Sequence, residues 1–477
     1  MNESSIARAS VLLFCFLANL ATLFLVDDHM RIYAAALFGA AQTIGILVWS
    51  RRYNPLDVYV LTMLLWSAQF PVCATLLAVF DIPIQYGVTL ESIGRATQLA
   101  NIAQLIVALV WRMPGLESLS RRIPRPRLGS IMNNARALAA IWVLSVAYRL
   151  GMSLLGGQAG YEVGGAAMDV RTNLLYVLGN VASLVPLLAF TAILKNTEVQ
   201  GGRLIAALIF LLEMVIVVVL SGSKSGPIVL AFNFLVGVHY VVKKISSRSV
   251  YCFLIVSLMA VIPFYAVKSR VRQGAIAYST EGSGSVGVSD YIWLHTEALK
   301  DSFDGSLFEL LSETSKALVH RMDVVTTLAA TMQHYQDQEH DTRMYMMLWV
   351  KPYIPRFLWE DKGWVGLGTF VSSEILGIPT YTHAAVNSTI EGYIAGGVLG
   401  ACVLAIIQGA FAGFLVNYLS LRRLREDDEQ YIALLAGAFL VILYFNMSYI
   451  IIRQIVTYVF FMWLVLWIVR FFARSSR

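Results

Sequence analysis

Long apolar segments, repeated through the whole 477-residue chain, constrain its fold more than any other feature. About 20 apolar residues in a helix cross the ~30 Å hydrocarbon layer of a bilayer. Inside that layer only helices and closed barrels satisfy their backbone hydrogen bonds. The composition agrees, because 58% of the residues are hydrophobic and only 14% are charged. The sequence therefore predicts an all-α polytopic membrane protein and excludes soluble enzymes and nucleic-acid-binding modules.

Hydropathy predicts about twelve transmembrane helices. Their expected ranges are 11–26, 32–49, 58–80, 97–111, 137–155, 174–194, 204–220, 227–242, 250–267, 388–418, 431–445 and 456–471. Alternate connections carry arginine and lysine clusters, and short basic loops lie on the cytoplasmic side of a membrane. We therefore expect both termini in the cytoplasm and the acidic loop with Asp27 and Asp28 on the outer face. The net charge of +6 needs no polyanionic partner, because these loops explain it.

The connection between the ninth and tenth predicted spans is far longer than a loop needs, with more than a hundred residues. We expect three parts, namely spans one to nine in 1–267, one large outer loop in 268–386, and spans ten to twelve in 387–477. Within the loop, Val325 and Leu328 belong to the apolar face of a predicted amphipathic helix. The loop either lies on the bilayer or covers an active site.

Seven basic residues fall near the outer face, against the charge rule: Arg149, Arg171, Lys224, Lys268, Arg270, Arg272 and Arg453. An arginine at the centre of a span costs about 2.5 to 3.5 kcal/mol on insertion scales, so such residues usually face a cavity or a partner. Each alone can reach lipid phosphates or pair with Glu213 or Glu391. Together they favour one shared anionic ligand, a lipid-linked diphosphate, because guanidinium groups bind phosphate oxygens bidentately.

The start of the tenth predicted span carries the residues best suited to proton transfer. If a helix begins at His383, then His383, Asn387 and Glu391 stack on one face and can activate a hydroxyl group. The alternative is that Asn387 or Ser388 caps the helix and Glu391 bonds to a neighbouring span. Three glycines that follow indicate close helix packing rather than chemistry: Gly396, Gly397 and Gly400.

Two cations of the large loop can join an anion site when the loop closes, or lie on a solvated helix face: Arg321 and Arg356. A cluster of possible metal ligands follows, but its spacing fits no zinc motif, and a polar turn is the preferred interpretation. Its members are His334, Asp337, Glu339, His340 and Asp341.

These features resemble the Wzy-type O-antigen and exopolysaccharide repeat-unit polymerases of bacteria, which are related to the O-antigen ligases. The resemblance rests on the many spans and on three segments: the Ser-Gly-Ser-Lys-Ser-Gly hairpin with Lys224, the Arg270-Val-Arg-Gln-Gly start of the large loop, and the stretch from His383 to Gly400. The hairpin departs from many relatives, which have arginine in place of Lys224.

The resemblance implies a C-type glycosyltransferase fold in the bacterial inner membrane, with a periplasmic active site and a periplasmic large loop. It implies transfer of a growing glycan from undecaprenyl diphosphate onto a new undecaprenyl-diphosphate-linked repeat unit. Expected partners are these donor and acceptor lipids, membrane lipids and a chain-length regulator, with no nucleic acid, cofactor or metal. Alternatives are an O-antigen ligase, which uses lipid A core as acceptor, and a flippase for the same lipid-linked oligosaccharide.

In the implied reaction His383 or Glu391 takes the proton of the acceptor hydroxyl. Preorganised donors stabilise the leaving diphosphate. The residues assigned to it are Lys224, Arg270, Arg272 and Arg453, with Arg321 and Arg356 from the loop.

Overall fold

The computed structural model describes about half of the chain. The described residues are 10, 14–15, 17–19, 21–22, 26, 28–50, 57–80, 82, 84, 86–122, 135–154, 185–195, 201–220, 226–239, 245–253, 267, 271, 293–294, 296–298, 300, 316, 319, 323–340, 342, 367–378 and 386–418. This part of the chain is mostly helical and contains no strand, so the all-α prediction is confirmed for it.

The chain forms two compact units, which are described separately. Unit 1 comprises Met1–Pro124, Lys316–Tyr418 and Ile442–Arg453. Unit 2 comprises Arg125–Ser315, Leu419–Val441 and Gln454–Arg477.

Four helical segments among the described residues are long and apolar enough to cross a membrane: Met30–Ser50, Tyr59–Val79, Leu90–Trp111 and Ser388–Phe414. They match the predicted spans 32–49, 58–80, 97–111 and 388–418, although the third begins seven residues earlier than expected. The predicted spans 431–445 and 456–471 lie outside the described residues. The count of twelve spans stays a prediction.

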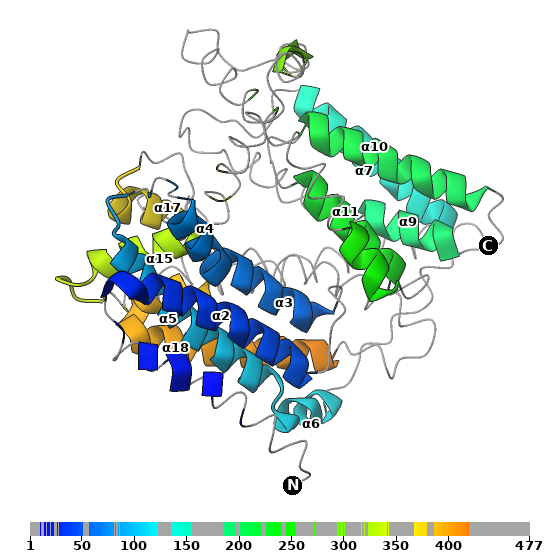
Figure 1. Ribbon diagram of the computed structural model, residues 1–477. Helices are drawn as coiled ribbons and strands as arrows, with labels where there is room; N and C mark the ends of the chain where they lie inside the picture. Colours follow the sequence, from blue (N-terminus) through cyan, green and yellow to red (C-terminus); the bar gives the residue numbers. More distant parts are fainter. Residues whose placement is uncertain are drawn as a thin grey trace, which may run out of the picture. The chain divides into compact units, whose positions relative to one another are not determined.

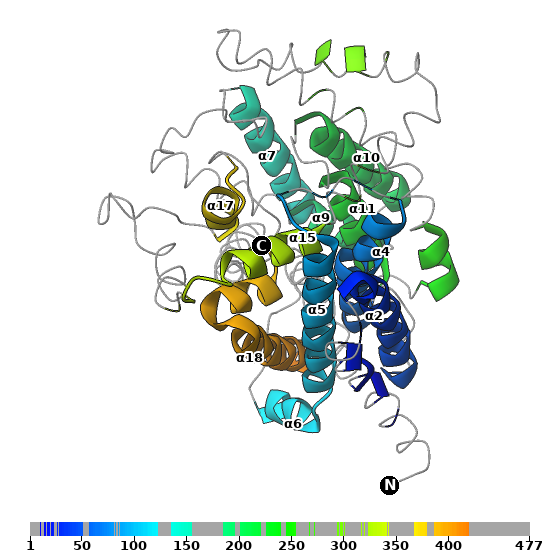
Figure 2. The same ribbon diagram turned by 60° about the vertical axis from the view of Figure 1, so that its left-hand side comes forward.

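Unit 1 is built around α5, as Figure 2 shows, with α2 on one side and α18 on the other. In chain order its elements are α2 (Asp28–Ser50), α3 (Val58–Ser67), η1 (Ala68–Val72), α4 (Cys73–Val79), α5 (Leu90–Trp111), α6 (Pro114–Arg122), α15 (Val324–His334), α17 (Leu367–Phe370), η6 (Val371–Ile375) and α18 (Ser388–Tyr418). Figure 1 labels the α-helices among these elements.

The third predicted span, 58–80, is one continuous apolar helix with a local change of helix type. Its middle part η1 is a π-helix that contains Pro71. A proline inside a helix has no N–H to donate and crowds the preceding turn. A π-bulge relieves this crowding without ending the helix, so α3, η1 and α4 continue one another.

Unit 1 buries several polar side chains within its apolar interior and exposes apolar side chains on its surface. Four polar side chains of α5 are fully buried: Thr97, Gln98, Asn101 and Gln104. On α2 the apolar side chains of Leu37 and Ile44 are instead 69% and 63% exposed. Exposed apolar surface of this kind fits contact with lipid rather than water.

An amide network joins three segments in this interior. The Gln42 Nε2 atom donates to the carbonyl oxygen of Asn101 at 2.7 Å and to Gln104 Oε1 at 3.0 Å. Asn19 Nδ2 donates to Gln42 Oε1 at 2.7 Å, and Gln104 Nε2 donates to Thr43 Oγ1 at 3.0 Å. The network therefore holds the N-terminal segment, α2 and α5 together, because separating them would leave buried amides unpaired.

Glycines let the helices of unit 1 approach closely. On α18, Gly409 and Gly413 face the backbone of α5: a Cβ at Gly409 would lie 2.9 Å from the Val107 carbonyl oxygen, and one at Gly413 would lie 2.5 Å from that of Trp111. This spacing of small residues four apart is a common interface in membrane helices.

The predicted amphipathic loop helix is buried on every side from Val324 to Thr331, and its last turn is partly exposed. Asp323 caps α15, with its Oδ1 atom accepting from the backbone N–H of Thr326 at 2.8 Å. Val325 and Leu328 are buried as expected, but so is every other residue from Val324 to Thr331. The expectation of one exposed face is wrong for this stretch, because α15 packs against α5, α18, η1 and η6 at once.

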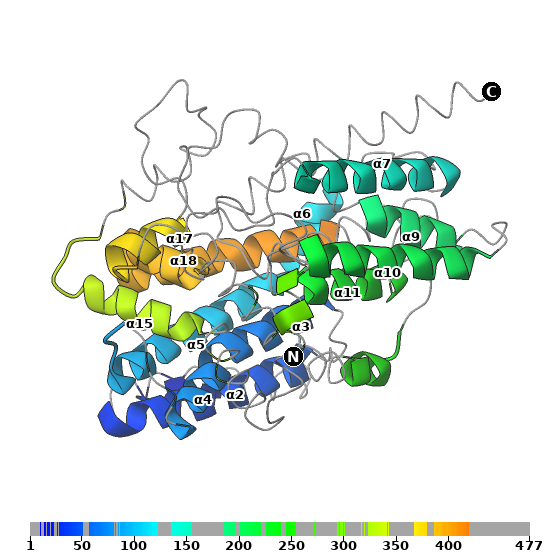
Figure 3. The same ribbon diagram turned by 90° about the horizontal axis from the view of Figure 1, so that it is seen from above.

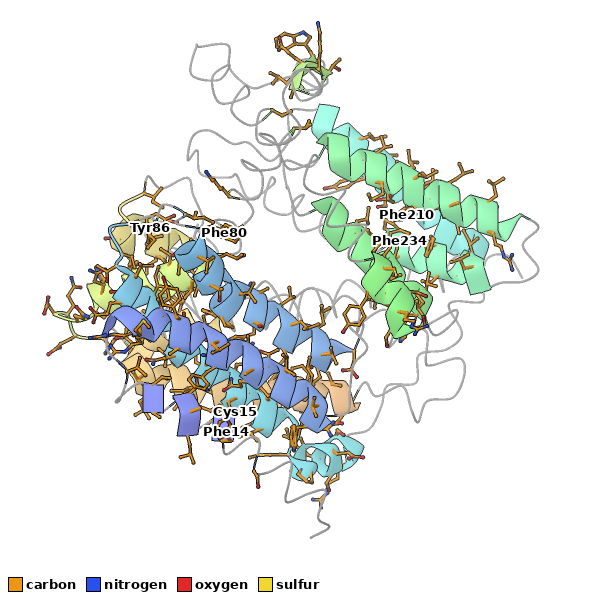
Figure 4. The ribbon with its side chains drawn as sticks, in the orientation of Figure 1. Phe14, Cys15, Phe80, Tyr86, Phe210 and Phe234 are labelled. Atoms are coloured by element: carbon orange, nitrogen blue, oxygen red, sulfur yellow. The ribbon has the colours of Figure 1, made fainter. Side chains whose placement is uncertain are left out.

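Unit 2 contains α7 (Ala135–Leu154), α9 (Val185–Lys195), α10 (Gly202–Leu220) and α11 (Gly226–Gly237). Figure 3 shows α9, α10 and α11 side by side. The ring of Phe234 joins them, lying 4.4 Å from Phe190 and 5.2 Å from Phe210 between centroids; Figure 4 labels the latter pair. Within this apolar packing Glu213 of α10 is buried and accepts a 2.8 Å hydrogen bond from Trp142 Nε1 of α7.

Candidate functional site

The candidate site lies where α18 is broken. Two glycines inside α18 leave helical geometry, Gly396 with φ −172° and ψ 34°, and Gly397 with φ 62° and ψ −146°. The conformation of Gly397 is one that residues with a Cβ rarely adopt. The break divides α18 into a first arm, 388–395, and a second arm, 398–418.

The two arms fold back on each other as a helical hairpin. Ser388 Oγ donates to Gln408 Oε1, twenty residues further along, although a continuous helix would separate these residues by about 30 Å. A Cβ at Gly392 would lie 2.6 Å from the Ala401 Cα atom, and one at Gly400 would clash with the Gly392 carbonyl oxygen. The packing prediction is therefore confirmed for Gly400. It is wrong for Gly396 and Gly397, which break the helix.

The first arm begins with an asparagine cap. Asn387 Oδ1 accepts from the backbone N–H groups of Thr389 at 3.1 Å and Ile390 at 3.2 Å. The helix starts at Ser388, as the predicted span 388–418 does, and the capping alternative is confirmed for Asn387. The condition for stacking His383 on Glu391, a helix that begins at His383, is not met. Glu391, one turn into this arm, is fully buried.

A turn from the large loop covers the break. The imidazole of His340 stacks on Tyr335, with centroids 5.1 Å apart and planes at 24°, and lies edge-on to Tyr393 of the first arm at 5.3 Å. Thr342 Oγ1 donates to the carbonyl oxygen of Ala395 at 2.6 Å. Carbonyl groups at a helix end have no intrahelical donor, so Thr342 stabilises the broken end.

His340 presents its imidazole to solvent beside the break. Its side chain is exposed, whereas Tyr335 and Tyr393 are 7% and 9% exposed. Its ring makes no hydrogen bond in the described part of the chain. A histidine held in one orientation by aromatic neighbours, with free ring nitrogens, can give or take a proton.

The other end of α15 carries a second electrostatic feature. Burial and, to a smaller extent, the negative charge of Asp323 raise the pKa of Tyr86. Tyr86 lies between the spans in a left-handed turn with Gly87, with φ values of 68° and 64°. Cys73 Sγ, at the start of α4, donates to the carbonyl oxygen of Val319, five residues before α15, at 3.7 Å.

Most of the predicted site residues lie outside the part of the chain that the structure describes. Those outside the described residues are Arg171, Lys224, Lys268, Arg270, Arg272, Arg321, Arg356, His383 and Arg453. Arg149 lies in α7, but its side chain is not described. Of the assigned catalytic and diphosphate-binding residues only Glu391 has a described side chain. The convergence of the basic residues on a diphosphate stays a prediction.

The polar-turn interpretation of the His334 cluster is confirmed for residues 336–340, which are exposed and follow α15 directly. Among the residues that the structure describes, no group of three His, Cys, Asp or Glu side chains is arranged to hold a metal ion. Sequence reasoning missed the position of His340 over the break. The adjacent pair Gly396 and Gly397 was the available signal, because glycine weakens a helix interior.

Comparison with models of known protein families gives no match, and neither curated proteins nor solved structures match the chain.

Proposed function

We propose that the chain is a membrane glycosyltransferase that polymerises undecaprenyl-diphosphate-linked oligosaccharide repeat units on the periplasmic face of the bacterial inner membrane. The observation that carries this proposal is a fully buried carboxylate, Glu391, in a broken helix whose break is covered by the exposed His340. Ionisable residues inside membrane spans are expensive and usually functional. Glu391 lies in the segment on which the resemblance to these polymerases rests.

In the proposed reaction an acceptor hydroxyl oxygen attacks the anomeric carbon of the donor glycan. The bond from that carbon to the diphosphate oxygen breaks, and the leaving undecaprenyl diphosphate keeps the electron pair. Glu391 or His383 takes the hydroxyl proton. Basic residues stabilise the charge on the leaving group, each by about 3 to 4 kcal/mol.

These basic residues are Lys224, Arg270, Arg272 and Arg453, with Arg149 and Arg171 near the outer headgroups and Arg321 and Arg356 from the large loop. Their positive charge makes a metal ion unnecessary for the proposed reaction. The ligase alternative uses the same groups with lipid A core as acceptor.

One observation favours a flippase as the second candidate. Transporters often bind their substrates at discontinuous helices, where the free helix ends point at the ligand. The hairpin of α18 is such a helix. A flippase would bind the same lipid-linked oligosaccharide without forming or breaking a glycosidic bond.

An assay of the purified protein in liposomes that contain lipid-linked repeat units distinguishes a polymerase from a flippase. The polymerase yields a ladder of lengthened lipid-linked glycans, whereas a flippase moves unchanged substrate to the opposite leaflet. The Glu391→Gln variant should lose the ladder. Glu213→Gln, which neutralises a buried carboxylate of unit 2, is the matched control and should keep it. Intact substrate alone, in either leaflet, would contradict the proposal.

A further inference from the structure

Three buried polar side chains of unit 1 stand apart from the amide network. Gln98 of α5 is 0% exposed, and neither its Nε2 nor its Oε1 atom has a hydrogen-bond partner in the described part of the chain. The same holds for the Oγ1 atoms of Thr326 and Thr389, in side chains that are 0% and 1% exposed.

Chain position explains why these two threonines are unpaired. A buried threonine in a helix normally donates to the carbonyl oxygen four residues earlier, as Thr97 does to Ile93 and Thr331 does to Thr327, both at 2.8 Å. Thr326 and Thr389 lie in the first turns of α15 and α18, so the residues four earlier precede their helices. Their hydroxyl groups therefore need a partner from elsewhere.

The three side chains come from helices that pack against one another. α15 contacts both α5 and α18, and α5 contacts α18; Figure 2 shows α15 beside both helices. Glutamine at a fully buried position cannot turn its amide to solvent. Since nearly all buried polar groups in proteins are hydrogen-bonded, directly or through water, an amide with two unpaired atoms points to a bound molecule.

We propose that Gln98 of α5 binds internal water in the interior of unit 1. The Gln98 amide is uncharged and both donates and accepts hydrogen bonds, which is the pattern that a water molecule needs. An ion would require a charged or more numerous set of ligands. A sugar is too large for a position with no exposed surface.

This site is independent of the proposed enzymatic function. It places water at the depth of apolar membrane spans, in the same unit as the hairpin that carries Glu391. Buried water of this kind is part of a protein's structure and is costly to remove.

The test compares the thermal midpoints of two purified variants in detergent. Methionine has nearly the shape of glutamine and suits a helix interior. If Gln98 binds water, Gln98→Met removes the hydrogen bonds and leaves the water short of partners, so the midpoint falls by about 2 to 4 °C. If the amide is dry, the same change removes an unpaired polar group, and an unchanged or higher midpoint overturns the proposal.

Gln104→Met is the matched control, because Gln104 Nε2 donates to Thr43 Oγ1 and to the Met63 carbonyl oxygen. The thermal midpoint of Gln104→Met should fall. The size of this fall is the effect expected when a hydrogen-bonded amide of α5 is lost. A cryo-EM map of the wild-type protein decides the matter if Gln98→Met does not fold. A density peak within about 3.2 Å of Gln98 Nε2 or Oε1 supports the proposal, and an amide surrounded by carbon atoms alone overturns it.

Discussion

The imidazole of His340 lies against the backbone of Gly397, with its Nε2 atom 2.8 Å from the position that a Cβ would take there. Two segments more than fifty residues apart therefore meet at the one point where α18 leaves helical geometry. The contact fixes the turn after α15 to the break and depends on the absence of a side chain at Gly397.

Replacement of Gly397 by alanine should destabilise unit 1 for two reasons. The φ of +62° strains any residue with a Cβ, at a cost of about 1 to 3 kcal/mol, and the new methyl group would displace His340. We expect a clear fall in the thermal midpoint of purified Gly397→Ala.

Gly396→Ala is the matched control for this variant. Gly396 has an extended φ of −172°, and nothing lies within 4 Å of its Cβ position. Its midpoint should stay close to that of the wild type. Equal losses in the two variants would contradict the described geometry of the break.

The contact between the hairpin arms gives a second prediction. Gly400→Ala should destabilise the protein strongly, because its methyl group would meet the carbonyl oxygen of Gly392, which is backbone and cannot rotate away. Gly115→Ala in α6, with open space at its Cβ position, should instead stabilise by about 0.5 to 1 kcal/mol. The thermal midpoints of the two purified variants, compared with that of the wild type, test both expectations. A stable Gly400→Ala variant would argue against a hairpin.

The raised pKa of Tyr86 gives a prediction for alkaline pH. Tyr86 stays neutral in the folded protein to a higher pH than in the unfolded chain, where tyrosine ionises near pH 10. Its contribution to stability is therefore fully present below about pH 10 and is lost as the pH rises further toward the folded-state pKa. The difference in absorbance at 295 nm between wild type and Tyr86→Phe, followed through an alkaline titration, reports this group.

Asp323→Asn separates the two causes of the raised pKa. Asparagine also caps helices well, so α15 should keep its N-cap while the negative charge is removed. The pKa of Tyr86 should fall only part of the way to its ordinary value, because burial is the larger cause. A complete return would assign the shift to Asp323 instead.

Long apolar segments in the sequence predict the positions of α2 and α18. The range 388–418 was predicted without error in its bounds, and the start and end of α2 were close. Hydropathy does not predict that 388–418 forms a helical hairpin, because the mean hydropathy of the span is insensitive to the two glycines at the break, Gly396 and Gly397. The network of Gln42, Asn101 and Gln104 cannot be predicted from the sequence either, because it depends on which side chains are neighbours in space.

At the candidate site, too, local features can be predicted from the sequence and long-range contacts cannot. Asn387 was recognised as a possible cap from its type and position, because capping is a local property. His340 was assigned to a solvated turn, which its exposure confirms, but its contact with Gly397 depends on how the chain returns to α18. Sequence spacing alone could not predict this long-range contact.

The most direct test of the central claim is the rate of glycan elongation by purified protein supplied with undecaprenyl-diphosphate-linked repeat units. The account predicts a ladder of products from the wild type and a rate about 10² to 10⁴ times lower for Glu391→Gln, if this carboxylate is the base. A wild-type protein that is folded and binds the lipid but never lengthens the glycan would contradict the account.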